Sequence, residues 1–342
     1  MGLQDDLPGN VIDLIRSASS AEFATVTATG TPLDTPLLCF PAEDLSTIDM
    51  ATGLAYPAKA ERVRRNPKVG LLIEGVRPGE PVISIAGMAA ARDADIQSNT
   101  VRYLSETDLL TNTDFPWEVR RKAIWYWPRI IIAIVPKQVL WWDNPDALDG
   151  EPHRWDAPAD TTFPSSDPAP SGPGVKAPKW REAPWRDLAK AAFDRAAVAH
   201  LSLMDRDGFP RIIRVRNARA TDRGLAFDIP AGAPGRREGP ASLTFAGRET
   251  FIGQLADDGG AAQLVVERTL PILPMMDNPN TAWNPAPEIR DALMGRLMAE
   301  LARRNQPLPT IPEAQPTPTQ GALRRQVREA GLVWDASSFR RL

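Results

Sequence analysis

The sequence predicts an α+β protein, mainly β, with two tandem β-barrels followed by helices at the C-terminus. Three observations predict this fold class. Short stretches of alternating polarity recur at regular spacing, as they do in barrels of antiparallel strands. The same order of helix, strand, turn and strand occurs twice, about 175 residues apart. The length of 342 residues exceeds one ordinary core and is typical of about two domains.

The first copy is expected over residues 1–143 and begins with an amphipathic helix at 11–15, which Asn10 is positioned to cap. A short helix carrying Lys59 and a helical region at 95–110 lie among its strands. Gly30 supplies a turn and Gly87 a β-bulge. Six strands are expected where the polarity alternates, at 23–28, 35–40, 46–52, 69–74, 82–91 and 129–139.

Residues 144–183 are rich in Pro, Ser, Asp and Gly and are expected to form an extended linker. The second copy is expected over 184–276. Its segment 230–235 has two prolines and two glycines where the first copy has the Lys59 helix, so we expect no helix and a degenerate barrel. The extension 277–342 is expected to form helices at 287–304 and 321–330, and to dock on the second barrel or a partner subunit.

Composition excludes several classes of function. The formal net charge of −3 disfavours a nucleic-acid partner. The single cysteine, Cys39, excludes an internal disulfide and is expected to be a buried apolar residue. His153 and His200 each stand alone, so we expect neither a metal site nor a Ser-His-Asp triad. No apolar stretch reaches the ~20 residues that span a bilayer, and no signal peptide is apparent, so we expect a cytoplasmic protein without a membrane partner.

The segment from Thr52 to Lys59 is the strongest functional signal. It places a lysine just after a strand end and at the start of a short helix, and Asn66 and Pro67 then open the next strand. Free backbone N–H groups converge at such a helix start and, together with the lysine, can bind an anion. We therefore expect a phosphate-bearing cofactor here. The other basic residues of this helix are interpreted as a solvated face: Arg62, Arg64 and Arg65.

With Thr52, Lys59, Asn66 and Pro67 in this order, the chain resembles the pyridoxamine 5′-phosphate oxidase-like superfamily of FMN-binding split barrels. The resemblance covers residues 10–140 well and 185–275 weakly. It implies an FMN along the second and third strands of the first copy, with its phosphate near Lys59 and its ring edge near backbone groups of 36–38. The residues it implies for cofactor binding are Thr35, Pro36, Leu37, Leu38, Thr52, Gly53, Tyr56 and Lys59.

The chain departs from the family pattern at three cationic positions. Thr35 and Phe40 stand where family members have Arg and Lys on the second strand, and Ala58 replaces a basic residue before the helix lysine. Pyridoxamine phosphate is therefore not the expected substrate. In the family, a dimer interface completes the site; here the second copy is expected to form an intramolecular pseudo-dimer, with a homodimer as the further option. Arg214 and Arg216, which alternate along one strand face, are expected to supply the missing cations.

The resemblance implies an FMN-dependent oxidoreductase whose flavin carries the redox chemistry, and no residue has the signature of an essential acid or base. Ten tryptophans point to a small apolar or aromatic substrate, with a nicotinamide as the candidate electron donor. Two alternatives stay open, an F420-dependent reductase of the same fold and a non-catalytic flavin-binding or scaffold protein. The candidates for the pocket wall are Trp117, Trp125 and Trp127.

Overall fold

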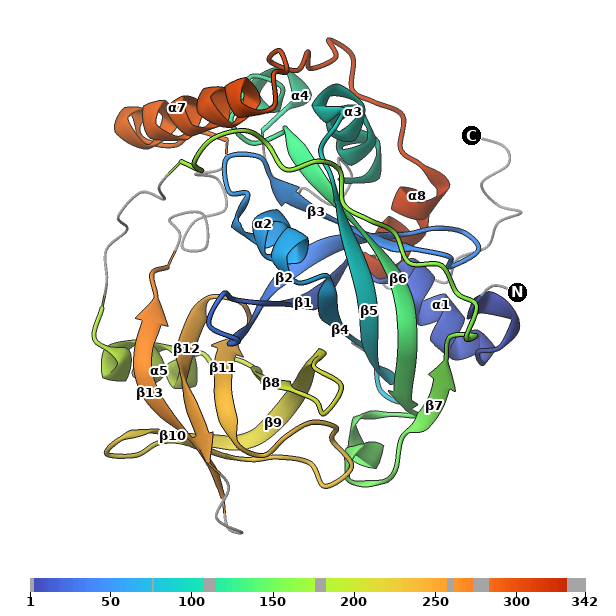
Figure 1. Ribbon diagram of the computed structural model, residues 1–342, viewed down its shortest axis with the longest axis vertical. Coiled ribbons are helices and arrows are strands. Elements are labelled where there is room, and N and C mark those ends of the chain that lie inside the picture. Colours follow the sequence, from blue (N-terminus) through green and yellow to red (C-terminus); the bar gives the residue numbers. More distant parts are fainter. Residues whose placement is uncertain are drawn as a thin grey trace.

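The computed structural model describes residues 3–75, 77–107, 115–175, 183–256, 261–272 and 283–330. Two β-barrels lie next to each other, the first coloured blue to green and the second yellow to orange (Figure 1). The mixed α+β class and the two tandem barrels are therefore confirmed. No helix in the described part of the chain combines the length and apolarity needed to cross a bilayer.

The first barrel has the strand order β3-β2-β1-β4-β5-β6 and is closed by pairing between β3 and β6. Phe23, Leu71 and Ile132 belong to its apolar core. The expected bulge is present, because the β5–β6 register shifts at Gly87. The strands are β1 (Ser20–Val26), β2 (Pro32–Pro41), β3 (Ile48–Gly53), β4 (Lys68–Glu74), β5 (Val82–Arg92) and β6 (Arg129–Trp142).

The described residues of the first copy contain four α-helices. Helix α1 packs Val11 and Ile15 into the barrel core, because its apolar residues recur with helical spacing. The cap expected of Asn10 is wrong, since the helix begins directly after Pro8, whose side chain cannot accept a hydrogen bond. The helices are α1 (Gly9–Ser17), α2 (Ala58–Arg65), α3 (Ile96–Thr107) and α4 (Trp117–Arg120).

The second barrel has the order β10-β13-β12-β11-β8-β9 and is closed by pairing of β9 with β10. Helix α5 (Trp185–Asp194) covers one side. In the fully described stretch 183–256 no helix joins β10 to β11, as the prolines and glycines at 230–235 predict. The strands are β8 (Ala199–Met204), β9 (Pro210–Ala220), β10 (Gly224–Asp228), β11 (Gly239–Phe245), β12 (Glu249–Ala256) and β13 (Ala262–Leu270).

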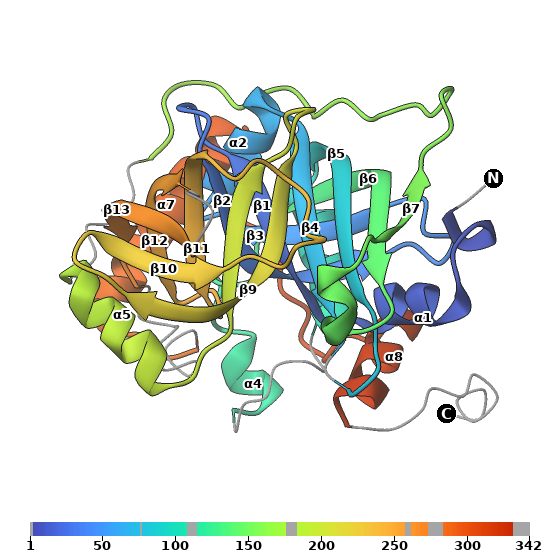
Figure 2. The same ribbon diagram turned by 90° about the horizontal axis from the view of Figure 1, so that it is seen from below.

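The barrels pack through two equivalent contacts. Strand β4 meets β9, and a Cβ placed on Gly70 would lie only 2.2 Å from the carbonyl oxygen of Pro210 (Figure 2). Strand β11 meets β2, and the Ser242 hydroxyl donates to the carbonyl of Pro32 at 2.8 Å. Pro32 and Pro210 occupy matching positions at the start of each hairpin's second strand. In the first contact the fourth strand of the first barrel meets the second strand of the second barrel, and in the second contact the barrels are interchanged. An approximate two-fold axis therefore relates the two barrels.

The segment between the barrels is held against the first barrel. It contains the short helix η3 (Pro145–Asp149) and the strand β7 (His153–Asp156), which pairs with β6. Further along, the Asp167 carboxylate accepts hydrogen bonds from the backbone N–H groups of Asp93 and Ala94 at 2.8 and 2.9 Å. The described part of the linker expected at 144–183, residues 144–175, is thus a strap that contacts this part of the barrel.

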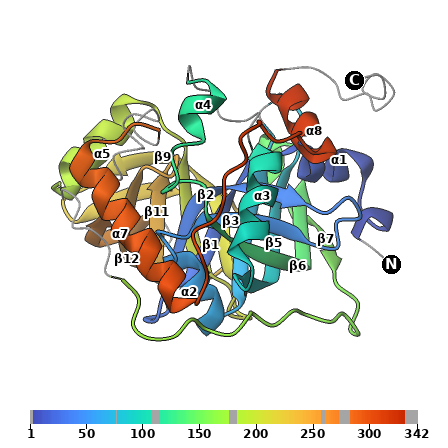
Figure 3. The same cartoon turned by 90° about the horizontal axis from the view of Figure 1, so that it is seen from above.

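The C-terminal extension contains α7 (Pro287–Arg303) and α8 (Gln320–Glu329). Leu297 and Leu301 of α7 pack against Leu54 and Ala60, close to α2 of the first barrel (Figure 3). The buried face of α7 therefore packs on the first barrel and not, as was expected, on the second, while docking on a partner subunit stays a prediction. The physical reason is the apolar end of the first barrel, which its own strands leave uncovered and α7 buries.

Candidate functional site

The sheet of the first barrel divides between β2 and β3. The two strands pair only from Cys39 to Pro41, opposite 48–50. Beyond this point, residues 36–38 of β2 pair on the β1 side alone, and residues 51–53 of β3 pair with β6. We call these diverging segments, 36–38 and 51–53, the split. The ladder between β2 and β3 therefore does not use the facing backbone groups of these segments.

The split brings together most of the residues expected at the cofactor. Pro36, Leu37 and Leu38 form one edge, and Thr52 and Gly53 form the other. The remaining residues adjoin the split along the chain. Thr35 directly precedes Pro36 in β2, Tyr56 lies in the loop after β3, and Lys59 lies in α2.

Aromatic residues cover the apolar side of the split. Leu38 and Ala51 pack in one cluster with Phe40 and Trp127. Trp127 is fully buried, and its indole N–H donates to the carbonyl of Arg120 at 2.8 Å. The cluster therefore forms a dry wall beside the split. It also contains the other two tryptophans considered for the pocket and several further rings: Trp117, Trp125, Tyr103, Tyr126 and Trp283.

Lys59 lies in the first turn of α2, directly beyond the β3 edge of the split. Burial, and then the charge of Arg62, lowers the pKa of its ammonium group to about 8. Burial and the charge of Arg65 lower the pKa of Arg62 to about 10. Within the described residues, none of these three groups forms an ion pair with a carboxylate. A bound anion would relieve this repulsion between cations.

The interpretation of the α2 arginines as a solvated face is wrong for two of them. Arg62 donates from Nε to the hydroxyl of Thr25 at 2.7 Å. Arg64 forms a buried ion pair with Asp93. Helical spacing alone could not reveal these partners, because Thr25 and Asp93 come from other parts of the first barrel.

Arg129 was not found from the sequence. It begins β6 opposite Gly53 and is buried. Its guanidinium carbon lies 4.1 Å from the ring centre of Tyr103 and 4.4 Å from that of Tyr126. A Cβ on Gly53 would be 3.4 Å from its Nη1, so the cation lies beside the split. The sequence places Arg129 three residues after Tyr126, close to other aromatic residues, but nothing in this run indicated the direction of the Arg129 side chain.

Arg214 and Arg216 lie in β9 and are engaged within the interface between the barrels. Arg214 is 3.8 Å from the Glu74 carboxylate, and Arg216 is 2.7 Å from that of Asp149. Strand β9 packs on β1, β4 and β5 of the first barrel. These two cations therefore have acidic partners at the interface, whereas Lys59, Arg62 and Arg65 on α2 have none among the described residues.

A buried charged cluster occupies the same interface. His200 Nε2 is 2.8 Å from Glu74 and its Nδ1 is 3.3 Å from Glu22. Burial opposes the charged imidazole, but the hydrogen bonds and charges of the two carboxylates outweigh it and raise the His200 pKa to about 10. Burial, and then the charge of Glu22, raises the pKa of Asp34. The sequence predicted a strand residue with a local partner, whereas both partners come from the other barrel.

Glu22 and His200 occupy equivalent positions in the two copies. Each lies four residues before the last strand residue of its hairpin, Val26 or Met204, which pairs with the matching proline. The approximate two-fold axis therefore places a carboxylate of one barrel against an imidazolium of the other.

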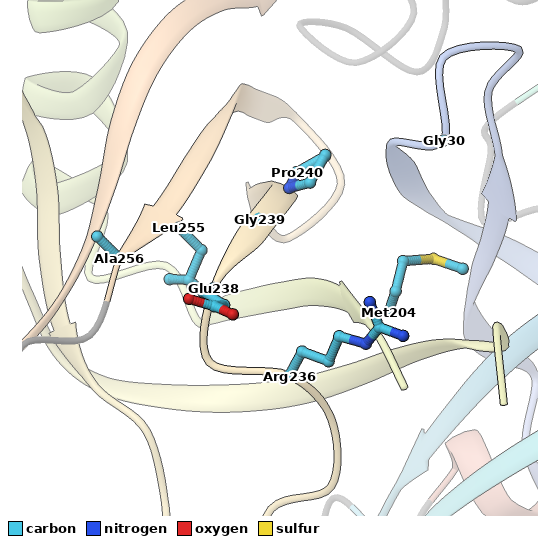
Figure 4. Close-up of a pocket in the computed structure, with 8 residues that line it drawn as sticks. All are labelled: Gly30, Met204, Arg236, Glu238, Gly239, Pro240, Leu255 and Ala256. Atoms are coloured by element: carbon cyan, nitrogen blue, oxygen red, sulfur yellow. The ribbon is translucent and has the colours of Figure 1, made fainter. Parts of the chain in front are cut away.

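A cavity of about 620 Å³ lies at the end of the second barrel (Figure 4). Met204 and Leu255 line it from the ends of β8 and β12, and Gly30 borders it from the first barrel. The matching strands of the first copy, β1 and β5, are covered by α2. The cavity thus lies where the second copy has no helix. None of the residues expected at the cofactor lines it.

Cys39 is fully buried, and burial raises the pKa of its thiol to about 11, so the expected apolar role is confirmed. Among the described residues, no three His, Cys, Asp or Glu side chains are arranged to hold a metal ion.

The chain is similar to pyridoxamine 5′-phosphate oxidase-like proteins. A putative pyridoxamine 5′-phosphate oxidase from Listeria innocua is 21% identical with a TM-score of 0.30, over 42% of this chain and 99% of that chain. A pyridoxamine 5′-phosphate oxidase-related, FMN-binding protein from Nostoc punctiforme is 17% identical with a TM-score of 0.30, over 42% and 84%.

An F420 reductase is 17% identical with a TM-score of 0.31, over 39% of this chain and 98% of that chain. No family model matches the sequence, and no curated protein matches it either. Each of these solved structures spans less than half of the chain, which has two barrels in tandem.

Proposed function

We propose that the chain binds FMN at the split and is an FMN-dependent oxidoreductase acting on a small apolar or aromatic molecule. The observation that carries the proposal is Lys59, a half-buried lysine with a lowered pKa and no acidic partner among the described residues. A phosphate is the group that such a lysine at a helix start favours. The adjacent split offers the free backbone edge that a flat ring requires.

The residues present fit the cofactor. Lys59 and Arg62 would hold the phosphate, and the backbone of 36–38 would hydrogen-bond the ring edge. The aromatic cluster around Trp127 excludes water from one side. FMN supplies the two-electron redox chemistry when bound.

The protein's own contribution is then binding, orientation and the exclusion of water. No described side chain at the split has the geometry of a general acid or base pair. A reduced nicotinamide is the electron donor that we propose. Steady oxidation of this donor by the flavin-loaded protein distinguishes an enzyme from a protein that only binds flavin.

Lys59→Ala is expected to weaken FMN binding by about ten- to a hundredfold, since a charge-assisted hydrogen bond contributes about 1.5–3 kcal/mol. The measurement is the visible absorption spectrum of the purified protein, followed by an FMN titration of both proteins. Lys190→Ala is the matched control, because Lys190 is exposed on α5 of the second copy. A wild-type protein that does not bind FMN refutes the proposal, and titration with F420 then tests the alternative cofactor.

A further inference from the structure

Helix α7 carries an arginine on the face that it buries against the first barrel. Arg296 is only 7% exposed and lies next to Leu297, which is fully buried. Its guanidinium carbon is 4.9 Å from the ring centre of Tyr56. Tyr56 belongs to the loop between β3 and α2, and a Cβ on Gly53 would lie 3.8 Å from its ring. Arg296 is therefore placed beside the β3 edge of the split.

The guanidinium of Arg296 has buried donors that are not used. Its Nε and Nη1 have no hydrogen-bond partner within the described residues. Arg303 and Arg304, about two turns further along the chain, both bond the Glu300 carboxylate. A buried N–H without a partner is unfavourable, so a ligand that accepts from these donors would be stabilised here.

A guanidinium that lies over an aromatic ring keeps its N–H groups free at its edge. Those groups match the paired oxygens of a phosphate or a carboxylate. Burial lowers the pKa of Arg296, although the neighbouring Tyr56 and Glu300 oppose this effect, and the side chain stays charged at neutral pH. An oxyanion matches both this charge and this geometry.

We infer that Arg296 of the C-terminal helix is an oxyanion-binding residue of the split, and that it binds either the cofactor phosphate or the carboxylate of a bound substrate. This inference rests on the proposed function. It assigns to α7 the role that the sequence assigned to Arg214 and Arg216, whose carboxylate partners lie at the interface between the barrels. The site is then completed by the extension after the second barrel.

The test uses the full chain and Arg296→Met, which keeps the length of the side chain and removes its charge. FMN, riboflavin and benzoate are the probes, with benzoate binding followed through the absorbance of the flavin-loaded protein. If Arg296 binds the phosphate, the dissociation constant for FMN rises about tenfold and that for riboflavin does not change. If it binds a substrate carboxylate, FMN binding is unchanged and the benzoate constant rises about tenfold.

Arg290→Met is the matched control, because Arg290 lies on the same helix and is exposed. Arg296→Lys keeps the charge without the planar fork, and an effect between wild type and Arg296→Met is expected. A thermal unfolding curve shows whether Arg296→Met is folded. If it is not folded, the same binding measurements are made on Arg296→Lys. Wild-type protein that binds FMN while every Arg296 variant binds all three probes normally overturns this inference alone. Wild-type protein that does not bind FMN overturns the proposed function instead.

Discussion

Replacing His200 with alanine is expected to lower the free energy of unfolding by about 3–5 kcal/mol. The imidazolium is buried between Glu22 and Glu74, and its removal takes away the cation that both carboxylates share and leaves Glu74 with the more distant Arg214, at 3.8 Å. Asp34, which is only 1% exposed, adds a third carboxyl group close to Glu22. Breaking a buried ion pair from one side has a larger cost than replacing both partners, since the remaining charges stay desolvated.

The same residue predicts a pH dependence. The His200 pKa is raised from about 6.5 in the unfolded chain to about 10 in the folded protein. A raised pKa means that folding favours the protonated form. The stabilisation is therefore complete below about pH 6.5 and is lost as the pH rises through about 10. The difference in stability between the wild type and His200→Ala should shrink across this range.

Urea unfolding at pH 6.5, 8 and 10 measures both effects. His153→Ala is the control, because His153 is exposed, and its contacts with Trp141 and with the exposed Asp143 carboxylate lie at the surface. We expect that control to stay within about 0.5 kcal/mol of the wild type. A His200→Ala protein as stable as the wild type at pH 6.5 would show that the cluster does not hold the barrels together.

Gly70→Ala is expected to lower the free energy of unfolding by about 3 kcal/mol. The added methyl group would lie 2.2 Å from the carbonyl oxygen of Pro210 and 3.0 Å from its carbonyl carbon. Both atoms belong to the backbone of the second barrel, so no side-chain rotation can relieve the overlap. Strand β4 must move away from β9, and the contacts between the barrels weaken.

Gly295→Ala is the matched control for this substitution. Gly295 lies inside α7, and a Cβ there would have no neighbour within 4 Å. Alanine in a helix interior is better than glycine by about 0.5–1 kcal/mol, so this variant should be slightly more stable. If Gly70→Ala unfolds at the same urea concentration as the wild type, the close approach of β4 to β9 is refuted.

The sequence predicted the barrels because their determinants are local. Alternating polarity marks strands, and Gly30 and Gly208, both with positive φ, mark the matching hairpin turns. The position of Lys59 after the third strand was predicted for the same reason. Its surroundings at the strand end and helix start depend on residues close to it in the chain.

Two further features, the position of Arg296 beside the split and the His200 cluster at the barrel interface, depend on residues that are distant in the chain. Arg296 reaches Tyr56 only because α7 packs on the first barrel. His200 meets Glu22 only because the two barrels associate. Amphipathic spacing shows that a helix has a buried face, but it does not identify the surface that the face contacts. A single sequence therefore predicted which residues of the first barrel lie at the split, but it gave no sign that Arg296 of α7 lies beside them.

The equivalence of Glu22 and His200 determines which barrel can recognise which. If the first barrel paired with a copy of itself through this face, two Glu22 carboxylates would meet where one now meets an imidazolium. Two second barrels would instead bring together two copies of His200. Buried like charges in contact are unfavourable, so pairing of the first barrel with the second is favoured over pairing of either barrel with a copy of itself. The covalent connection thus joins two halves that have become complementary rather than identical.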